Sequence, residues 1–284
     1  MIEPATLELI SEQYRKKLPF VVYSLPDSQE ITVILQKNST YYPTEDFTKS
    51  AFVFYPFSNN HKDYCIPKEH ATVLKQQVSL RLLETQPINF EENAATKSQY
   101  EDLVSKTVSN IKTRNAQKIV VSRKASLTIA PINFEEILYR LLLIYPTAFR
   151  YLWYHPETSI WCGVTPEVLL KTSDTCFTTM ALAGTQKNDS IQRIEWGEKE
   201  RNEHQLVIDD IVDKLQSILS VIKVSKTYNF NAGPVVHLRT DITGCIKKGK
   251  STLTEIAASL HPTSAVCGTP EAFLKNSIET HEVV

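Results

Sequence analysis

Residues 196–222 begin Trp196-Gly-Glu-Lys-Glu-Arg-Asn-Glu-His204 and continue as an apolar-periodic run. The apolar residues recur at helical spacing: Ile208, Ile211, Val212, Leu215, Ile218, Leu219 and Ile222. This spacing predicts an amphipathic helix with one buried face. Counting back along the same face reaches Val207, Glu203 and Glu200. The sequence therefore predicts two carboxylates on the face that the rest of the helix buries.

The Glu200 and Glu203 pair has two interpretations. In the first, both belong to a solvated first turn, where acidic residues also suit the helix dipole. In the second, the pair is partly buried and holds a hard divalent cation through oxygen ligands, because an unpartnered buried carboxylate costs several kcal/mol. The helix alone favours the solvated interpretation, so the choice depends on the rest of the chain.

The composition excludes several classes of protein. The chain has 284 residues, 42% of them hydrophobic, and a net charge of −1, which gives no field suited to nucleic acid or an anionic membrane. Its five cysteines show no Cys-x-x-Cys spacing and are typical of reduced thiols. The N-terminus has no signal-peptide pattern and no stretch is long and apolar enough to span a membrane. We expect a soluble, cytoplasmic protein.

The order of expected elements predicts an α+β fold. Helices are predicted over residues 1–18, 196–222 and 251–260. Two more are predicted to begin at the capping patterns Ser98-x-x-Glu101 and Asn133-x-x-Glu136, and a last one to begin at Pro270. Strands are predicted over residues 19–26, 30–37, 51–57, 118–127, 148–155, 159–165, 168–172, 176–182 and 235–246. The connections between strands are short, which favours a large, mostly antiparallel sheet core with helices packed outside. We expect one domain over residues 1–284.

Several polar residues lie in or beside these strands. Each could have a functional role or an ordinary structural or solvated one. Lys118 is either a strand-end lysine whose amine reaches water or a partly buried base. Glu167 is either an exposed turn carboxylate or a protonated acid in a cleft of low dielectric constant. The amides and hydroxyl of Ala183-Gly184-Thr185 could hold a carboxylate, although such turns are common. A lone histidine on an apolar strand, such as His237, is more often structural.

Six motifs follow one another in an order that resembles the chorismate-utilising enzymes. They are Lys118-Ile-Val-Val-Ser-Arg, Thr165-Pro-Glu-Val-Leu-Leu, Ala181-Leu-Ala-Gly-Thr185, Glu200-Arg-Asn-Glu-His204, His237-Leu-Arg-Thr and Leu260-His-Pro-Thr-Ser-Ala-Val-Cys-Gly-Thr-Pro270. The resemblance covers about residues 110–278 as the family core, and residues 1–95 match only loosely. It implies the chorismate-utilising enzyme fold.

The resemblance also implies roles for individual residues. Lys118 is expected to be the general base that activates water for attack at C2 of chorismate, and Glu167 the general acid that protonates the departing C4 hydroxyl. Glu203 is expected to be a direct Mg²⁺ ligand, with Glu200 a ligand or a water-mediated neighbour. The expected substrate-binding residues are Ala183, Gly184, Thr185, His237 and Ala265.

Within the family, the motifs are most similar to those of isochorismate synthases. Enzymes of the covalent aminodeoxychorismate synthase type carry a nucleophilic lysine where Ala183 stands, and salicylate synthases tend to carry threonine at the Ala265 position. Anthranilate synthases typically lack the lysine at the Lys118 position. A salicylate or anthranilate synthase-type enzyme remains the alternative, as does a non-catalytic binding domain. Isochorismate could feed either menaquinone or siderophore biosynthesis.

The family pattern normally continues past the end of this sequence. It then supplies a tyrosine and an arginine for the substrate, a Gly-Ala-Gly loop and a second pair of metal-binding glutamates, whereas the sequence given ends at Val284. We therefore expect weak Mg²⁺ binding by Glu200 and Glu203 alone. The expected states are an inactive truncated enzyme, an enzyme completed by a C-terminal polypeptide, or a binding domain, as a monomer or weak oligomer.

Overall fold

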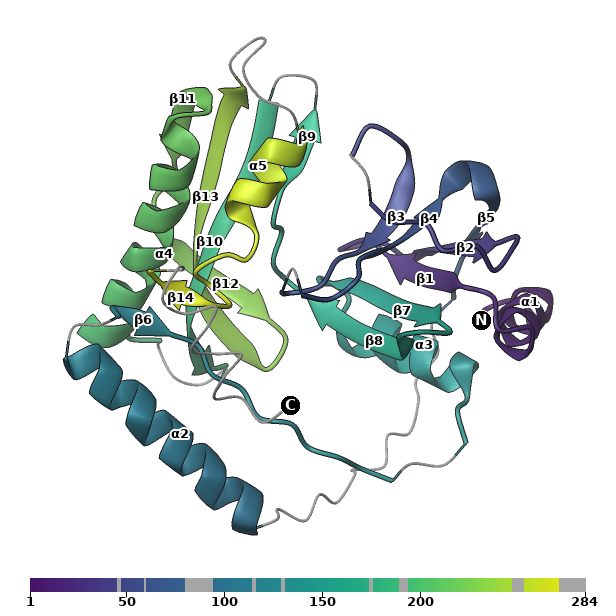
Figure 1. The fold of residues 1–284 in the computed structure, drawn as a ribbon, viewed down its shortest axis with the longest axis horizontal. Helices are drawn as coiled ribbons and strands as arrows, with labels where there is room; N and C mark the ends of the chain where they lie inside the picture. Colours follow the sequence, from purple (N-terminus) through teal and green to yellow (C-terminus); the bar gives the residue numbers. More distant parts are fainter. Residues whose placement is uncertain are drawn as a thin grey trace. The chain divides into compact units, whose positions relative to one another are not determined.

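The computed structural model describes residues 1–44, 47–58, 60–79, 94–113, 116–128, 131–173, 176–188, 194–246 and 253–270. The chain divides into two compact units, each made of two separate segments (Figure 1). Unit 1 comprises Met1–Thr85 and Ile129–Glu167, and unit 2 comprises Gln86–Thr128 and Val168–Val284. The single domain expected over residues 1–284 stays a prediction, and the two units are described separately.

Unit 1 is built on a five-stranded antiparallel sheet in the order β5-β2-β1-β7-β8. The strands are β1 (Phe20–Ser24), β2 (Glu30–Gln36), β5 (Ala71–Gln77), β7 (Phe149–His155) and β8 (Ser159–Thr165). Helices α1 (Pro4–Arg15) and α3 (Phe134–Ile144) share one core with the sheet. The hairpin of β3 (Ala51–Phe54) and β4 (Tyr64–Pro67) shares a second core with it, and the short helix η1 (Lys68–His70) precedes β5. Because the sheet is covered on both faces, neighbouring residues of β1, which point to opposite faces, are both buried.

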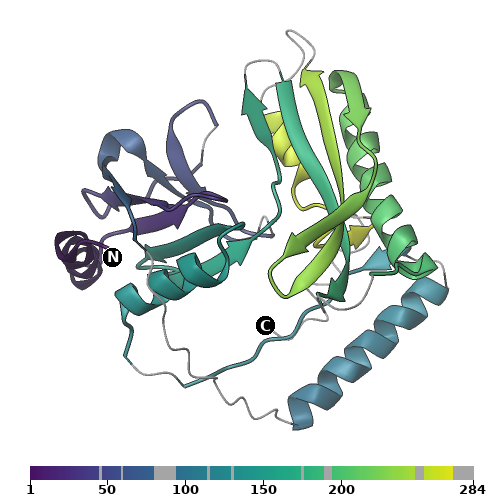
Figure 2. The same cartoon turned by 180° about the vertical axis from the view of Figure 1, so that it is seen from behind.

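Unit 2 is built on a second antiparallel sheet, in the order β11-β13-β10-β9, with β12 also paired to β13. The strands are β9 (Lys171–Ser173), β10 (Cys176–Lys187), β11 (Leu219–Val224), β12 (Tyr228–Ala232) and β13 (Val235–Ile246). Helices α4 (Glu198–Gln216) and α5 (Leu253–Leu260) pack together with the sheet in one core. Both views show α4 lying along a face of this sheet (Figure 2).

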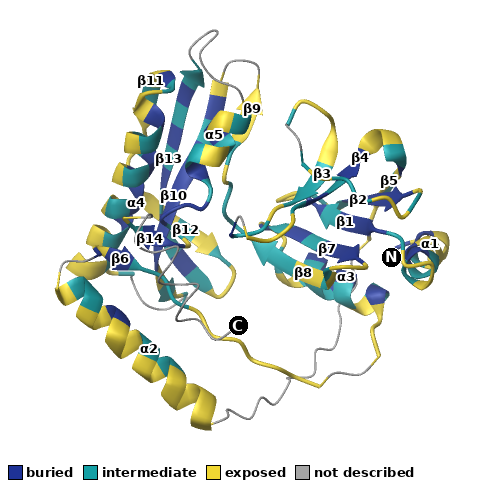
Figure 3. Cartoon of the chain, in the orientation of Figure 1, coloured by how far each residue is buried: buried dark blue, intermediate teal, exposed yellow. Residues whose placement is uncertain are grey.

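Two further pieces of unit 2 complete the description. A two-stranded ladder pairs β6 (Lys118–Ile119) with β14 (Gly268–Thr269), joining distant parts of the sequence. Helix α2 (Ala94–Lys112) is amphipathic in sequence but largely exposed, and Thr107 is the buried residue on it (Figure 3). In the part of the chain that the structure describes, no helix is long and apolar enough to cross a membrane.

The predictions were most accurate where local chemistry marks an element boundary. The Asn133 side chain accepts a hydrogen bond from the Glu136 backbone N–H at 3.1 Å and begins α3 where the capping pattern placed it. Strands β8 and β13 have the predicted bounds, and β1, β2, β3 and β7 differ from prediction only at their ends. The α+β class with antiparallel sheets is confirmed.

Several element boundaries were wrong. Helix α4 ends at Gln216 rather than near Ile222, because the β-branched residues that follow form β11 against β13. Helix α2 begins at Ala94, four residues before the predicted cap Ser98, within two alanines that favour helix. Strand β9 begins later than predicted, at Lys171, and β12 was missed. The helix expected from Pro270 lies outside the described residues.

Two errors concern the strands that carry candidate site residues. Strand β6 stops at Ile119, and Val120 makes one further backbone hydrogen bond, to the Cys267 carbonyl oxygen at 3.0 Å. Residues 120–127 form no strand, because β14 offers only two residues for pairing. Conversely, β10 runs on to Lys187, so Ala183-Gly184-Thr185 lies within a strand paired to β13 rather than in a loop.

Candidate functional site

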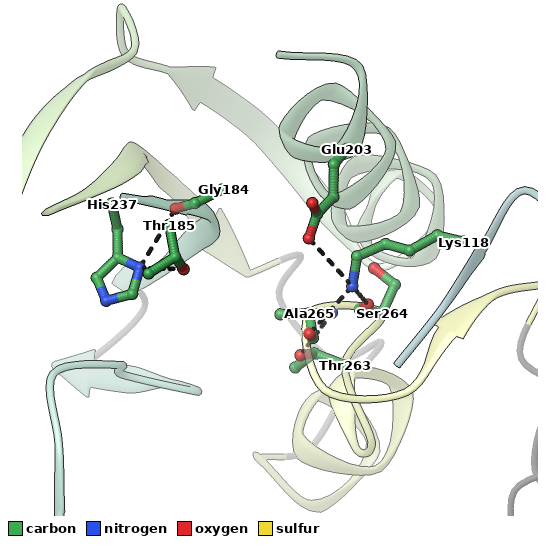
Figure 4. Close-up of polar contacts among 8 residues, drawn as sticks. All are labelled: Lys118, Gly184, Thr185, Glu203, His237, Thr263, Ser264 and Ala265. Atoms are coloured by element: carbon green, nitrogen blue, oxygen red, sulfur yellow. Dashed lines mark hydrogen bonds and ion pairs between the residues drawn. The ribbon is translucent and has the colours of Figure 1, made fainter. Parts of the chain in front are cut away.

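Lys118 is a buried lysine whose amine is held by a distant loop. Its side chain is 6% exposed, and Nζ donates hydrogen bonds to the carbonyl oxygens of Ser264 at 2.7 Å and Ala265 at 3.1 Å (Figure 4). The β6–β14 ladder places Lys118 opposite Thr269, the last residue of β14. The amine therefore does not reach free solvent. The interpretation of Lys118 as a solvated strand-end lysine is wrong.

The loop that receives the Lys118 amine is itself shaped by hydrogen bonds to Thr263. The Thr263 carbonyl oxygen accepts from the backbone N–H groups of Val266 at 3.1 Å and Cys267 at 3.0 Å. The Thr263 hydroxyl oxygen accepts from the Ala265 N–H at 3.2 Å. These bonds form a tight turn after α5, which directs two neighbouring carbonyl oxygens toward one amine.

The two carboxylates of α4 lie at the start of that helix. Glu203 Oε1 is 4.0 Å from Lys118 Nζ, and the Glu203 side chain is 35% exposed. Glu200 lies one turn earlier, and its carboxylate folds back over the N-cap residue Gly197, where a Cβ would lie 2.7 Å from Glu200 Oε2. Further along the same face, Val207 and Ile211 are buried. The helix thus carries half-buried carboxylates at the edge of its apolar face.

His204 is the fully buried polar residue of α4. Its Nε2 shares a hydrogen bond with the Thr240 hydroxyl at 2.8 Å, and Thr240 in turn shares one with Thr227 at 2.8 Å. Burial lowers the pKa of His204 from 6.5 to about 4, against an opposing effect of the Ala183 backbone. A neutral imidazole joining α4 to β13 is a structural contact.

Gly184, Thr185 and His237 form a second group, on β10 and β13. The pairing register shifts between Ala183 and Thr185, and Gly184 takes φ +73°, a conformation that glycine adopts without strain. At this bulge, His237 Nδ1 lies 3.0 Å from the Thr185 hydroxyl and 3.3 Å from the Gly184 carbonyl oxygen. Burial lowers the pKa of His237, against the opposing effect of its hydrogen bond with the Gly184 backbone, and this favours the neutral ring.

Gly184 also lies against the acidic helix. A Cβ added at Gly184 would be 3.4 Å from Glu200 Cβ. Unit 2 therefore assembles two separate groups of predicted site residues. Lys118, Glu203 and Ala265 form one group, and Gly184, Thr185 and His237 form the other (Figure 4).

Glu167 is the last residue of unit 1 and lies two residues after the end of β8. It is half-buried, and its backbone N–H donates to the Thr165 hydroxyl at 3.2 Å. This bond holds the turn through Pro166. A shared site of Glu167 with the residues of unit 2 stays a prediction.

The carboxylates at the start of α4 are the type of ligand that a hard cation prefers, but two of them do not complete its coordination shell. Among the described residues, no three His, Cys, Asp or Glu side chains gather as a metal-binding group. Glu200 and Glu203 contribute two carboxylates from adjacent turns of α4. Mg²⁺ is often held by one or two carboxylates, with waters and substrate oxygens completing its shell. The two residues thus fit an ion that shares its coordination with a substrate.

Two residues of the site were not singled out from the sequence. Ser264 is 1% exposed and provides the shorter hydrogen bond to Lys118. Thr240 anchors His204. Each stands in a quoted motif, but its contribution comes from a backbone carbonyl or from a contact across the sheet, and residue type alone signals neither.

Comparison with known proteins agrees with the motifs. The family described as "Chorismate binding enzyme" matches residues 50–284, a wider span than the expected core of 110–278. The chain is 27% identical over 208 residues to the isochorismate synthase EntC of Escherichia coli (strain K12), covering 69% of this chain and 53% of that protein. It is 26% identical over 220 residues to the isochorismate synthase MenF of Pasteurella multocida (strain Pm70), covering 74% of this chain and 51% of the relative.

A solved structure shows the same fold. The menaquinone-specific isochorismate synthase MenF from Escherichia coli superposes with a TM-score of 0.66 at 18% identity, covering 93% of this chain and 73% of that one. The chain spans about half the length of the curated relatives it matches. The family match extends over most of the sequence, and the chain belongs to the chorismate-binding enzyme family.

Proposed function

We propose that this chain contributes the active site of a Mg²⁺-dependent isochorismate synthase, which isomerises chorismate by adding water at C2 and expelling the C4 hydroxyl. The observation that supports this most directly is the Lys118 amine, buried and held between the Ser264 and Ala265 carbonyl oxygens beside Glu203. A solvated surface lysine does not need burial or two fixed hydrogen bonds, whereas a general base needs a fixed position.

The contacts of Lys118 fix the position of its amine, and its charged form pairs with the Glu203 carboxylate 4.0 Å away. A neutral amine has two N–H donors and one lone pair. Two carbonyl oxygens accept from Nζ, which orients the lone pair toward a third direction. In the proposed reaction Lys118 removes a proton from the attacking water as its oxygen bonds to C2. Glu167 gives a proton to the C4 oxygen as that C–O bond breaks, so one water enters and one leaves.

The remaining residues bind and orient the substrate. Thr185 and the backbone at Gly184 offer a hydroxyl and amide groups at the β10 bulge, and the neutral ring of His237 holds the Thr185 hydroxyl. Ala183 and Ala265 are assigned to the walls of the same site. Glu203 and Glu200 would hold Mg²⁺, which supplies positive charge for a substrate carboxylate. A cytoplasmic location stays part of this prediction.

The test is chorismate consumption by the purified chain with Mg²⁺, with products separated by liquid chromatography. We expect isochorismate, and Lys118→Ala should lower turnover by about 10²–10⁴-fold, the usual contribution of a general base. Lys124→Ala, at an exposed lysine of the same segment, is the matched control. Lys118→Gln keeps a donor for the Ser264 carbonyl and serves if the alanine variant does not fold.

Other outcomes would contradict the proposal. Salicylate, or anthranilate in the presence of ammonia, would assign the chain to another chorismate enzyme. No consumption at any Mg²⁺ concentration would favour a binding domain or a chain that needs a complementing polypeptide. Turnover that survives both Lys118 variants would remove Lys118 from the mechanism.

A further inference from the structure

Cys176 and Cys245 form a thiol pair across two neighbouring strands of unit 2. They stand directly opposite each other in the antiparallel register of β10 and β13, and their Sγ atoms are 4.0 Å apart. Both are free cysteines in the structure. Neither has a part in the proposed reaction.

The pair lies on the accessible face of the sheet. The next residue of β10, Phe177, belongs to the core that α4 covers, as does Ile242 of β13. Because side chains alternate along a strand, Cys176 and Cys245 point to the opposite face. Cys176 is exposed and Cys245 is half-buried, so a small oxidant in solution can reach the sulfur atoms.

We propose that Cys176 and Cys245 are an oxidation site that closes to an intrachain disulfide. Directly opposed residues of an antiparallel pair have Cα atoms about 4.5–5.5 Å apart, inside the roughly 4.4–6.8 Å range that disulfides require. The backbone is therefore already in position, and rotation of the two side chains brings the sulfur atoms together.

The reaction needs a two-electron oxidant, which we take to be a hydroperoxide such as hydrogen peroxide. The Cys176 thiolate attacks one peroxide oxygen, so that an S–O bond forms, the O–O bond breaks and hydroxide leaves, taking a proton to become water. The Cys245 sulfur then loses its proton and attacks the Cys176 sulfenic acid, an S–S bond forms, and a second water leaves. Two thiols lose two electrons and two protons.

The order of these steps follows from the exposure of the two thiols, because the exposed Cys176 meets a dissolved oxidant before the half-buried Cys245. The hydrogen bond with Cys176, and then its charge, raise the pKa of the Cys245 thiol, and the nearby Lys223 opposes this weakly. The raised pKa leaves less of Cys245 in the thiolate form. The thiolate is the nucleophile, which makes the more exposed cysteine the attacking residue and Cys245 the resolving one.

The disulfide would stabilise unit 2 without touching the proposed active site. It joins residues 69 positions apart, a loop that includes β10 and α4, and restricting that loop in the unfolded chain raises stability. Cys176 begins β10, whereas the bulge at Gly184 lies near the other end, roughly 25 Å away along an extended strand. We therefore expect a change in melting temperature and no change in turnover.

The experiment compares the reduced protein with protein treated with stoichiometric hydrogen peroxide. Peptide mapping by mass spectrometry should show one linked Cys176–Cys245 peptide and a mass loss of two hydrogen atoms. The melting temperature should rise by about 5–10 °C and fall back with dithiothreitol. Cys176→Ser and Cys245→Ser should each abolish both changes, while Cys162→Ser, at an exposed cysteine of β8, should keep them.

Two results would overturn the proposal. The first is oxidation to sulfinic or sulfonic acid, or disulfide-linked dimers, without the linked intrachain peptide. The second is a linked peptide whose formation leaves the melting temperature unchanged, because the stabilisation of unit 2 would then be wrong. Both readouts are independent of chorismate, so they are separate from the test of the proposed function.

Discussion

The Lys118 amine and the Ser264 carbonyl oxygen are 2.7 Å apart although 146 residues separate them in the sequence. The contact is possible because β6 pairs with β14 directly after the loop that carries Ser264. Ser264 is 1% exposed, so water does not compete for its carbonyl oxygen. The position of the proposed base is thus set by a short ladder and a turn, and changes near either end of this contact should affect activity before they affect the fold.

Glu203→Gln should weaken Mg²⁺ use with little loss of stability. The variant keeps the shape of a half-exposed side chain but removes the negative charge that a hard cation needs. We expect the Mg²⁺ concentration for half-maximal turnover to rise about tenfold or more, measured by the chorismate assay. Glu198→Gln, in the exposed first turn of α4, is the control and should behave as the wild type. Equal effects of both variants would indicate a general charge effect.

Glu167→Gln should remove turnover while leaving the melting temperature unchanged. An amide cannot give up a proton to the C4 oxygen, so we expect a loss of about 10²–10⁴-fold. The backbone bond to Thr165 that shapes this turn does not involve the substituted group. Glu69→Gln, at an exposed carboxylate of unit 1, provides the comparison. Wild-type turnover in Glu167→Gln would exclude it as the acid.

His204 should make the stability of the protein depend on pH. Its pKa is about 4 in the folded chain against 6.5 for a free imidazole, so below pH 6.5 the unfolded chain binds a proton that the folded chain does not bind. The stability contribution is complete above pH 6.5 and is lost as pH falls toward 4, by about 3 kcal/mol. Burial lowers the pKa values of His155 and His237 too, with the same sign.

The check for His204 is urea unfolding at several pH values between 7.5 and 4.5. His204→Asn should flatten the decline and, by disturbing the bond to Thr240, cost about 1 kcal/mol at pH 7.5. His61→Asn, at an exposed histidine, should leave the profile unaltered. A profile of His204→Asn that is parallel to the wild type would show that this residue does not carry the effect.

Gly184→Ala should damage activity more than a matched glycine substitution. A side chain at φ +73° costs about 1–2 kcal/mol, and the new Cβ would lie in van der Waals contact with Glu200, at 3.4 Å from its Cβ. Gly233→Ala carries a similar strain, at φ +65°, in the turn between β12 and β13. Both should lower the melting temperature by similar amounts, but only Gly184→Ala should raise KM for chorismate. Equal kinetics of the two variants would argue against a substrate role for the bulge.

The sequence by itself determined the family, the class of fold and the elements with strong local signals. The order of six motifs identified the family, and the Asn133 cap and the alternating pattern of β13 marked elements correctly. Such signals are local, because a cap or a period depends on residues a few positions apart. The sequence did not determine where α4 ends or how far β6 runs, because a β-branched run fits either structure until a partner strand is present.

Only the tertiary structure decided what the polar residues contact. From the sequence, Lys118 was either solvated or buried, and the choice came from two carbonyl oxygens of a loop near the other end of the chain. The same holds for Cys176 and Cys245, whose proximity follows from the register of β10 and β13. Residue type sets the chemistry a group can perform, whereas burial and long-range pairing set which partner it meets, and these depend on the packing of the whole unit.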